Sequence, residues 1–260
     1  MSSYSHVSQV YDLVYRERTD DAAFYGSVVA RSVAGSGARR VIEIGAGTGR
    51  VLLPIARAHP EVSFTALDMD HDELAVLQGK VGRAGIPNVE VVCLDLAQMA
   101  WKEHFDLVMA PFRVLQHCLS AEDLSTAFSR IWSALKPGGT FAFDLFNPSI
   151  PALAHSGLVV SQDFVDAAGT EINRTVYVNE RSYFDQIQHI EEYYRVFDAP
   201  GQTRNLSWVY DTRYFFKGEV EPLLLSGGFS IDAVHGDFKG TPFGQGVYPG
   251  DLVFVAAKPL

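Results

Sequence analysis

Cysteine and long apolar runs are scarce in this chain. Its 260 residues include two cysteines, Cys93 and Cys118, which form no Cys-x-x-Cys pair. This scarcity fits a reduced, cytoplasmic setting. No apolar run approaches the roughly 20 residues that cross a membrane. Residues 1–10 also lack the basic-then-apolar pattern of a signal peptide. We therefore expect a cytoplasmic protein with no membrane partner.

Basic residues are outnumbered. The chain has 21 Lys and Arg against 31 Asp and Glu, which gives a net charge of −10 at pH 7, and it contains no basic run. Because phosphate binding depends on clustered Lys and Arg, we expect no nucleic-acid partner. Hydrophobic residues make up 47%, enough for a full core in one elaborated α/β domain or two small domains.

A glycine-rich turn is the main motif that is present. Residues 41–50 read VIEIGAGTGR, so that four mostly apolar residues precede Gly45, Gly47 and Gly49. The apolar part predicts a buried strand, and the glycines predict a tight turn into a helix whose free N–H groups can hold an anion. A dinucleotide-binding fingerprint, Gly-x-Gly-x-x-Gly, would need a third glycine where this chain has Arg50.

Acidic residues follow the next two predicted strands. Asp68 comes directly after the predicted strand 62–67, and Asp95 comes directly after the predicted strand 89–94. An acid after the second strand can accept hydrogen bonds from both ribose hydroxyls, in NAD enzymes and methyltransferases alike. Asp95 can accept from an adenine amine. The alternatives are that Asp68 caps a helix and that Asp95 is a solvated loop carboxylate.

A histidine follows the fourth predicted strand, residues 105–110. Ligands of open α/β sheets lie beyond the carboxyl ends of the strands, so a substrate-facing group is expected here. His117 is the candidate, because histidine can take a proton near neutral pH. The alternative is a histidine at a helix start that is bonded to backbone.

A fourth motif completes a family resemblance. Residues 135–139, Leu-Lys-Pro-Gly-Gly, precede the apolar strand 140–145. With the acid–glycine motif, Asp68 and Asp95, this phrase resembles class I S-adenosylmethionine (SAM)-dependent methyltransferases over residues 41–145. The resemblance implies an α/β fold, a doubly wound Rossmann-like seven-stranded sheet of order 3-2-1-4-5-7-6. It also implies S-adenosyl-L-methionine as the cofactor.

The resemblance implies roles for individual residues. Glu43 and the glycines would shape the methionine pocket, Asp68 would bind ribose and Asp95 adenine. The full set of expected cofactor-binding residues is Tyr15, Arg16, Glu43, Gly45, Ala46, Gly47, Gly49, Asp68, Met69, Asp95, Leu96 and Ala110.

The N-terminal phrase Tyr-Asp-Leu-x-Tyr-Arg at residues 11–16 is similar to that of small-molecule N-methyltransferases, including enzymes that act on nucleotide-linked amino sugars. In some of that group a tyrosine and a histidine lie near the transferred methyl, which implies Tyr11 and His117 as the catalytic residues. Tyrosine rings suit a sulfonium, and Arg16 can pair with the methionyl carboxylate. Glu17 stands where that group often has glycine. The alternative is an amphipathic helix that only packs on the domain.

We expect four regions: an N-terminal helical cap (1–36), a SAM-binding core (37–147), an antiparallel β insertion (148–218) and the end of the core sheet (219–260). The insertion would cap the substrate or contact a second subunit, which makes a homodimer possible. No metal is expected. Asp144 and Asn147 follow the fifth strand, where catechol-type methyltransferases carry metal ligands, but no clear third ligand accompanies them.

These observations predict a SAM-dependent methyltransferase that acts on nitrogen or oxygen of a small molecule. Two alternatives stay open. One is a non-catalytic SAM-binding regulatory or partner protein, because the sequence motifs specify the cofactor site but not the acceptor site. The other is a nucleotide-dependent oxidoreductase, which Arg50 disfavours.

Overall fold

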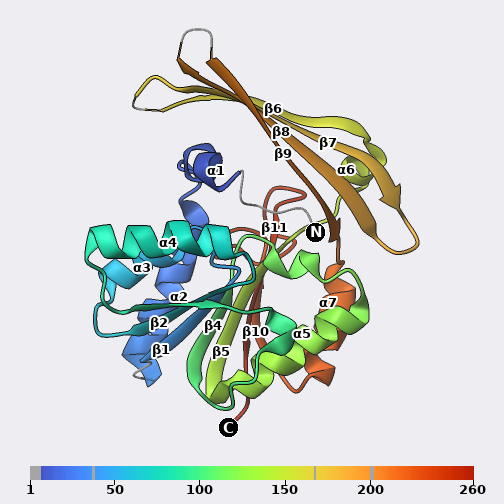
Figure 1. The fold of residues 1–260 in the computed structure, drawn as a ribbon. Coiled ribbons are helices and arrows are strands. Elements are labelled where there is room, and N and C mark those ends of the chain that lie inside the picture. Colours follow the sequence, from blue (N-terminus) through green and yellow to red (C-terminus); the bar gives the residue numbers. More distant parts are fainter. Residues whose placement is uncertain (1–6, 37–38, 167, 200–201) are drawn as a thin grey trace.

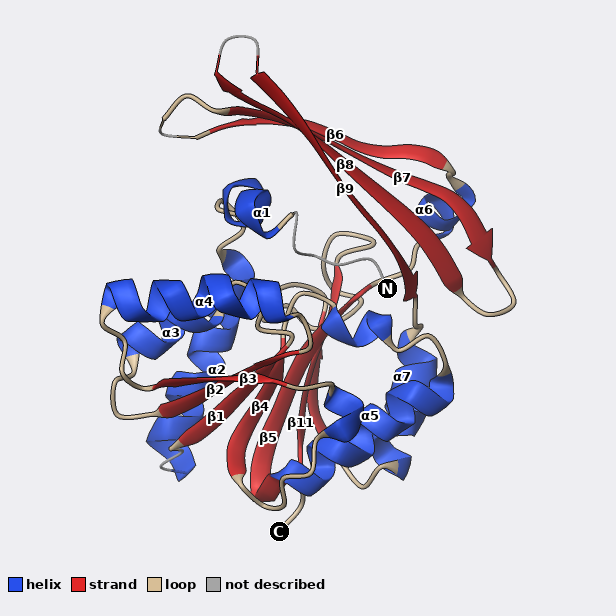
Figure 2. Ribbon diagram, in the orientation of Figure 1, coloured by secondary structure: helices blue, strands red, loops and turns tan. Residues whose placement is uncertain are grey.

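The described part of the chain folds around two separate β-sheets. A computed structural model describes residues 7–36, 39–166, 168–199 and 202–260 (Figure 1). One sheet has seven strands and the other has four. In Figure 2 the smaller sheet lies above the carboxyl edge of the larger one, with helix α1 (Ser8–Val14) between them.

The seven-stranded sheet confirms the predicted fold class. Its strand order is 3-2-1-4-5-11-10, and its last two strands are antiparallel to their neighbours. Its strands are β1 (Arg40–Ile44), β2 (Ser63–Asp68), β3 (Val89–Cys93), β4 (Phe105–Ala110), β5 (Leu135–Phe146), β10 (Ser230–His235) and β11 (Asp251–Ala257). Val41 and Ile42 are both fully buried, because helices cover both faces of the sheet.

Helices form one layer on each face of this sheet. On one face α2 (Asp20–Ser36), α3 (Leu52–Ala58) and α4 (His71–Ala84) pack on the core, and on the other α5 (Ala121–Ala134) and α7 (Lys217–Ser226) do so. Short 3-10 turns η2 (Leu96–Gln98) and η3 (Val114–His117) follow β3 and β4. No helix in the described ranges is both long and apolar enough to cross a membrane.

The smaller sheet interrupts the chain between β5 and α7. It is an antiparallel meander of β6 (Gly157–Val165), β7 (Glu171–Ser182), β8 (Ile187–Ala199) and β9 (Gln202–Arg213), preceded by α6 (Ile150–Ala154). We call these four strands the insertion sheet. Apolar residues of α1, among them Val10 and Val14, pack against its inner face. The boundaries of the four predicted regions stay predictions.

One strand begins earlier than the sequence predicts. The apolar strand was expected over residues 140–145, yet β5 already starts at Leu135. The pairing shifts from Phe105 with Leu135 to Leu107 with Thr140, so the extra residues form an irregularity inside the strand.

Candidate active site

The glycine turn after β1 allows other groups to approach its backbone closely. Gly45 and Gly47 have φ of 69° and 51°, a conformation that side chains rarely adopt. A Cβ at Gly47 would lie 2.8 Å from a carboxylate oxygen of Glu73, and one at Gly45 would lie 2.3 Å from Val114. The turn is therefore lined directly by α4 on one side and η3 on the other.

Asp68, at the end of β2, lies directly against this turn. Its two carboxylate oxygens accept hydrogen bonds from the backbone N–H groups of Gly47 at 2.9 Å and Asp70 at 3.0 Å. Burial raises the pKa of Asp68. Met69 adds a third backbone hydrogen bond, and because a carboxylate offers about four acceptor positions, capacity remains for a hydroxyl group of a ligand. The helix cap is Asp70, which accepts from the N–H groups of Asp72 and Glu73.

Two buried carboxyl groups near the turn lack partners. Glu43 is 2% exposed and Glu73 is 6% exposed. One oxygen of each, Oε2 of Glu43 and Oε1 of Glu73, has no hydrogen-bond partner within the described part of the chain. Burial raises the pKa of Glu43 well above its usual range and that of Glu73 to about 8, with Asp68 adding repulsion to both. Buried polar groups normally have partners, so each of these two oxygens has unused capacity to accept a hydrogen bond.

These residues fit SAM. The cofactor carries ribose hydroxyl donors together with a positively charged sulfonium and amino group, which match acceptors and carboxylates around the turn. Asp68 can hold the ribose, and Glu43 can accept a hydrogen bond from a polar group of the methionine part. The glycine backbone permits the close approach.

The other expected cofactor residues also follow the ends of the parallel strands. Asp95 is half-buried, and its carboxylate accepts from the N–H of Ala97 at 2.9 Å as the cap of η2. That bond leaves the second oxygen of Asp95 for a ligand. Ala46 donates its N–H to Leu67, Ala110 is fully buried, Leu96 is half-buried and Met69 is 61% exposed. The role of each stays a prediction.

Helix α1 brings two tyrosines to the glycine turn. Thr48 in the turn donates to the carboxylate of Asp12 at 2.7 Å, which ties α1 to the core. The rings of Tyr11 and Tyr15 are 4.7 Å apart, and Phe112 after β4 lies 6.1 Å from the first and 4.9 Å from the second. The three rings form an aromatic group at the carboxyl edge of the sheet.

Arg50 fills the position where a dinucleotide-binding motif would have glycine. Its guanidinium donates to the buried carboxylate of Asp21 at 2.6 and 2.9 Å, and lies 4.8 Å from the ring centre of Phe112. Arg50 also hydrogen-bonds the hydroxyl of Tyr11. Burial nevertheless raises the pKa of Tyr11 well above its usual value, so this hydroxyl stays protonated at neutral pH.

Arg16 lies apart from this group. Its side chain is exposed and donates to the carbonyl oxygen of Val165 in β6 at 3.1 Å. Its pairing with the methionyl carboxylate stays a prediction. The guanidinium groups of Arg18 and Arg50 lie 4.9 and 4.8 Å from the centre of the Phe112 ring. Neither arginine was among the site residues expected from the sequence.

His117, the last residue of η3, faces the insertion sheet. Its ring lies 5.7 Å from Tyr210 and 6.5 Å from Trp208, which are themselves stacked 3.6 Å apart on β9. The imidazole has solvent-accessible surface, yet the side chains around it still desolvate it and lower its pKa. The structure therefore brings the predicted histidine to a boundary between core and insertion.

A buried ion pair inside the insertion sheet was not predicted. Arg174 on β7 contacts the carboxylate of Glu192 on β8 at 2.9 and 3.0 Å, and donates to the hydroxyl of Tyr15 at 2.8 Å. Tyr210 donates to the other oxygen of Glu192 at 2.8 Å. This network joins α1 to the strand that faces His117. The alternation of Ile172, Arg174 and Val176 on one strand face was the available signal, but it does not identify the partner.

The residues considered as metal ligands have other roles. Asp144 accepts hydrogen bonds from the Tyr25 hydroxyl at 2.7 Å and the Phe112 N–H at 2.8 Å, and Asn147 donates to the Pro249 carbonyl. Within the described ranges, no group of three or more His, Cys, Asp or Glu side chains is placed to hold a metal. The expectation of a metal-free site stays a prediction.

The strand order and glycine turn define an α/β protein of the class I methyltransferase type, and comparisons with known proteins agree. Residues 41–139 match the family described as "Methyltransferase domain". A solved SAM-dependent methyltransferase from Clostridium acetobutylicum superposes with a TM-score of 0.80 at 15% identity, covering 99% of both chains. A SAM-bound amino pentose methyltransferase from Micromonospora echinaspora gives 0.72 at 23% identity, covering 96% of both.

Sequence relatives point to the same class. The tRNA (guanine-N(7)-)-methyltransferase of Enterococcus faecalis is 24% identical over 147 residues, which are 52% of this chain and 69% of that protein. The chain thus contains a methyltransferase domain, and the predictions of a SAM-dependent methyltransferase and of its cofactor are confirmed. The match spans as little as 36% of the length of another curated relative, the malonyl-[acyl-carrier protein] O-methyltransferase of Priestia megaterium.

One prediction is wrong. The expectation that no nucleic acid is a partner conflicts with the tRNA (guanine-N(7)-)-methyltransferase among the curated relatives. The physical reason is that contacts to phosphates depend on where Lys and Arg lie on a surface, so a net charge of −10 does not exclude such an acceptor.

Proposed function

We propose that this protein transfers the methyl group of SAM to a nitrogen or oxygen atom of a small molecule. The observation that supports this most directly is the placement of His117 against the stacked rings of Trp208 and Tyr210. The acceptor would bind at this boundary between core and insertion, beside the cofactor residues. When bound, SAM supplies an electrophilic methyl group on a positively charged sulfur.

The residues around the glycine turn would hold and orient the cofactor. Asp68 would accept hydrogen bonds from the ribose hydroxyls, and Glu43 would receive a donor from the methionine part. The rings of Tyr11 and Tyr15 would offer faces to a cation, whereas the Phe112 ring already faces the guanidinium groups of Arg18 and Arg50. Holding two reactants in line can contribute about 7–11 kcal/mol to lowering a barrier.

His117 would remove the proton that the acceptor loses. Because desolvation lowers its pKa below the usual 6.5, the imidazole is mainly neutral at pH 7 and can take up a proton. The proton that the acceptor loses on gaining the methyl group would pass to the imidazole and then to water, and S-adenosylhomocysteine would leave with the electron pair of the broken sulfur–carbon bond. Tyr11 keeps its own proton, so it would orient the acceptor or face the cation instead of serving as the base.

A small amine is the first acceptor class to test. A protein of similar fold is named an amino pentose methyltransferase, and a neutral imidazole is a suitable base for an ammonium group. The stacked rings on β9 would supply a flat apolar surface for the body of such a molecule.

The test is a transfer assay with SAM labelled in its methyl group. The panel contains small amines including amino sugars, phenols, and an unmodified tRNA transcript. We expect label in a small molecule, with a mass increase of about 14 Da for one methyl group replacing one hydrogen. Label in the transcript and in no small molecule would contradict the proposal. S-Adenosylhomocysteine binding without any transfer would favour the non-catalytic alternative.

A further inference from the structure

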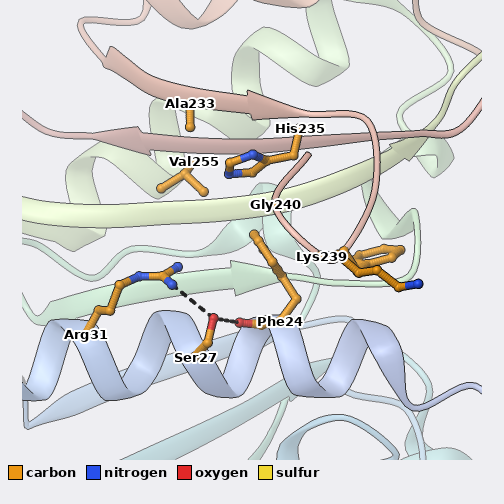
Figure 3. A pocket seen from close by; sticks show the side chains of 9 residues that line it. Phe24, Ser27, Arg31, Ala233, His235, Lys239, Gly240 and Val255 are labelled. Atoms are coloured by element: carbon orange, nitrogen blue, oxygen red, sulfur yellow. Dashed lines mark hydrogen bonds between the residues drawn. The ribbon is translucent and has the colours of Figure 1, made fainter. Parts of the chain in front are cut away.

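A hollow lies beside α2, and none of its lining residues belongs to the glycine turn. It has a volume of about 340 Å³ and lies between α2, β10, β11 and the segment that follows β10. Figure 3 shows Arg31 and Ser27 rising from α2 toward His235 on β10. The residues that line it are not among the cofactor or acceptor residues described above.

Two cationic side chains line the hollow, Arg31 at one end and Lys239 at the other (Figure 3). Arg31 donates to the Ser27 hydroxyl at 3.2 Å, and no carboxylate within the described ranges forms an ion pair with it. Lys239 also lines the hollow, and its ammonium has no carboxylate partner within 4 Å among the described residues. The nearby Asp237 carboxylate accepts from the backbone N–H groups of Lys239 and Thr241, both at 2.9 Å. Unpaired cations are notable in a chain of net charge −10.

The lining of the hollow is also aromatic and contains an unsatisfied polar atom. The ring of Phe24 lies 5.8 Å from that of His235 and 6.0 Å from that of Phe238. Nδ1 of His235 is buried and has no hydrogen-bond partner within the described part of the chain. Such an atom is rare in folded proteins.

We propose that this hollow binds a small aromatic carboxylate. The aromatic body would pack on Phe24 and Phe238, and the carboxylate would pair with the planar guanidinium of Arg31, a geometry that favours two parallel hydrogen bonds. The ring of His235, which lies 5.8 Å from that of Phe24, would contact the same aromatic body. The volume of about 340 Å³ lies at the lower end of the usual range for small-ligand sites, about 300–1,000 Å³.

The test uses 2-naphthoate as the probe and the neutral 2-naphthalenemethanol as its matched control. Binding to the full chain is measured by calorimetry with saturating S-adenosylhomocysteine present, so that the cofactor site is filled. We expect 2-naphthoate to bind at least about tenfold more tightly than the alcohol, because the alcohol lacks the charge. In a ¹H–¹⁵N spectrum, the ring signals of His235 should shift on addition of the acid.

Two variants separate this site from others. Arg31→Met should weaken 2-naphthoate binding about tenfold or more, whereas Arg130→Met, an exposed arginine on α5 at the opposite face of the sheet, should leave it unchanged. His117→Ala should also leave it unchanged, which excludes binding at the acceptor site.

No binding at 10 mM probe (a concentration about tenfold above a weak, millimolar affinity) would overturn the proposal. Equal binding of wild type and Arg31→Met would overturn it as well.

Discussion

At the scale of single residues, the burial of Glu73 predicts how stability depends on pH. Its pKa is raised from an ordinary 4.5 to about 8, first by burial and then by repulsion from Asp68 and Asp70. The folded protein therefore keeps this proton at neutral pH, whereas the unfolded chain has released it. The free energy of unfolding should fall as pH rises from about 4.5 to 8, by about 1.4 kcal/mol per pH unit from this group, and show no further loss above.

Glu73→Gln tests this, because it keeps the shape of the side chain and removes its titration. Urea unfolding at pH 5, 7 and 9 should show a weaker loss of stability with rising pH in the variant than in the wild type. Glu122→Gln, at an exposed position in the first turn of α5, is the matched control and should follow the wild type. Parallel wild-type and Glu73→Gln curves would mean that Glu73 ionises normally in the folded protein.

His117 predicts a separate effect on turnover. Once an acceptor has been identified, His117→Ala should lower kcat for its methylation by about 10²–10⁴-fold. The affinity for S-adenosylhomocysteine should be unchanged, because the His117 ring faces the proposed acceptor site. Because the pKa of His117 is lowered, the rate of the wild type should hold until pH falls below 6.5. His59→Ala, at the end of α3, is the control. Unchanged turnover in His117→Ala would leave His117 a structural residue.

At the scale of elements, the ion pair of Arg174 and Glu192 joins the insertion sheet to α1. Both side chains are at most 10% exposed, so removing one partner leaves a buried charge. Arg174→Met should therefore lower the free energy of unfolding by about 3–5 kcal/mol, and the second change Glu192→Gln should recover part of that loss. Urea unfolding of both variants measures the difference.

The matched control is Arg195→Met, because Arg195 lies on the exposed face of the same sheet. It should change the free energy of unfolding by no more than about 0.5 kcal/mol. If Arg174→Met were equally mild, the pair would have to be solvated in the folded protein, and the link between α1 and the insertion would depend on apolar contacts alone.

The elements that could be predicted from the sequence are those with a strong local pattern. The parallel strands β1, β2 and β4 are buried along most of their length and flanked by turns, so they read as short apolar runs. Strand β6 is largely exposed along its length, so it has no regular apolar alternation and was missed. The ion pair of Arg174 and Glu192 was missed for another reason: it depends on the register between two strands, which local sequence does not specify.

At the scale of the whole molecule, three parts meet at the carboxyl edge of the main sheet. Helix α1 contacts the glycine turn through Asp12 and Thr48, and contacts the insertion sheet through Tyr15 and Arg174. Residues next to the strand ends could be predicted as site residues, because the topology rule places ligands there. Arg18 and Trp208 could not, because long-range packing alone brings them to the site.

This arrangement predicts that cofactor binding stabilises the molecule as a unit. At a concentration of S-adenosylhomocysteine 100 times its Kd, the free energy of unfolding should rise by about 2.7 kcal/mol, which corresponds to an increase in Tm of about 5–10 °C. Differential scanning calorimetry measures the shift, with NADH as the control that should give none.

At the same ligand concentration, Asp68→Ala should lose most of the increase, because it removes the acceptor expected to hold the ribose. A shift with NADH and none with S-adenosylhomocysteine would contradict the assignment of the glycine turn to SAM. An equal shift in Asp68→Ala would instead contradict only the placement of the ribose.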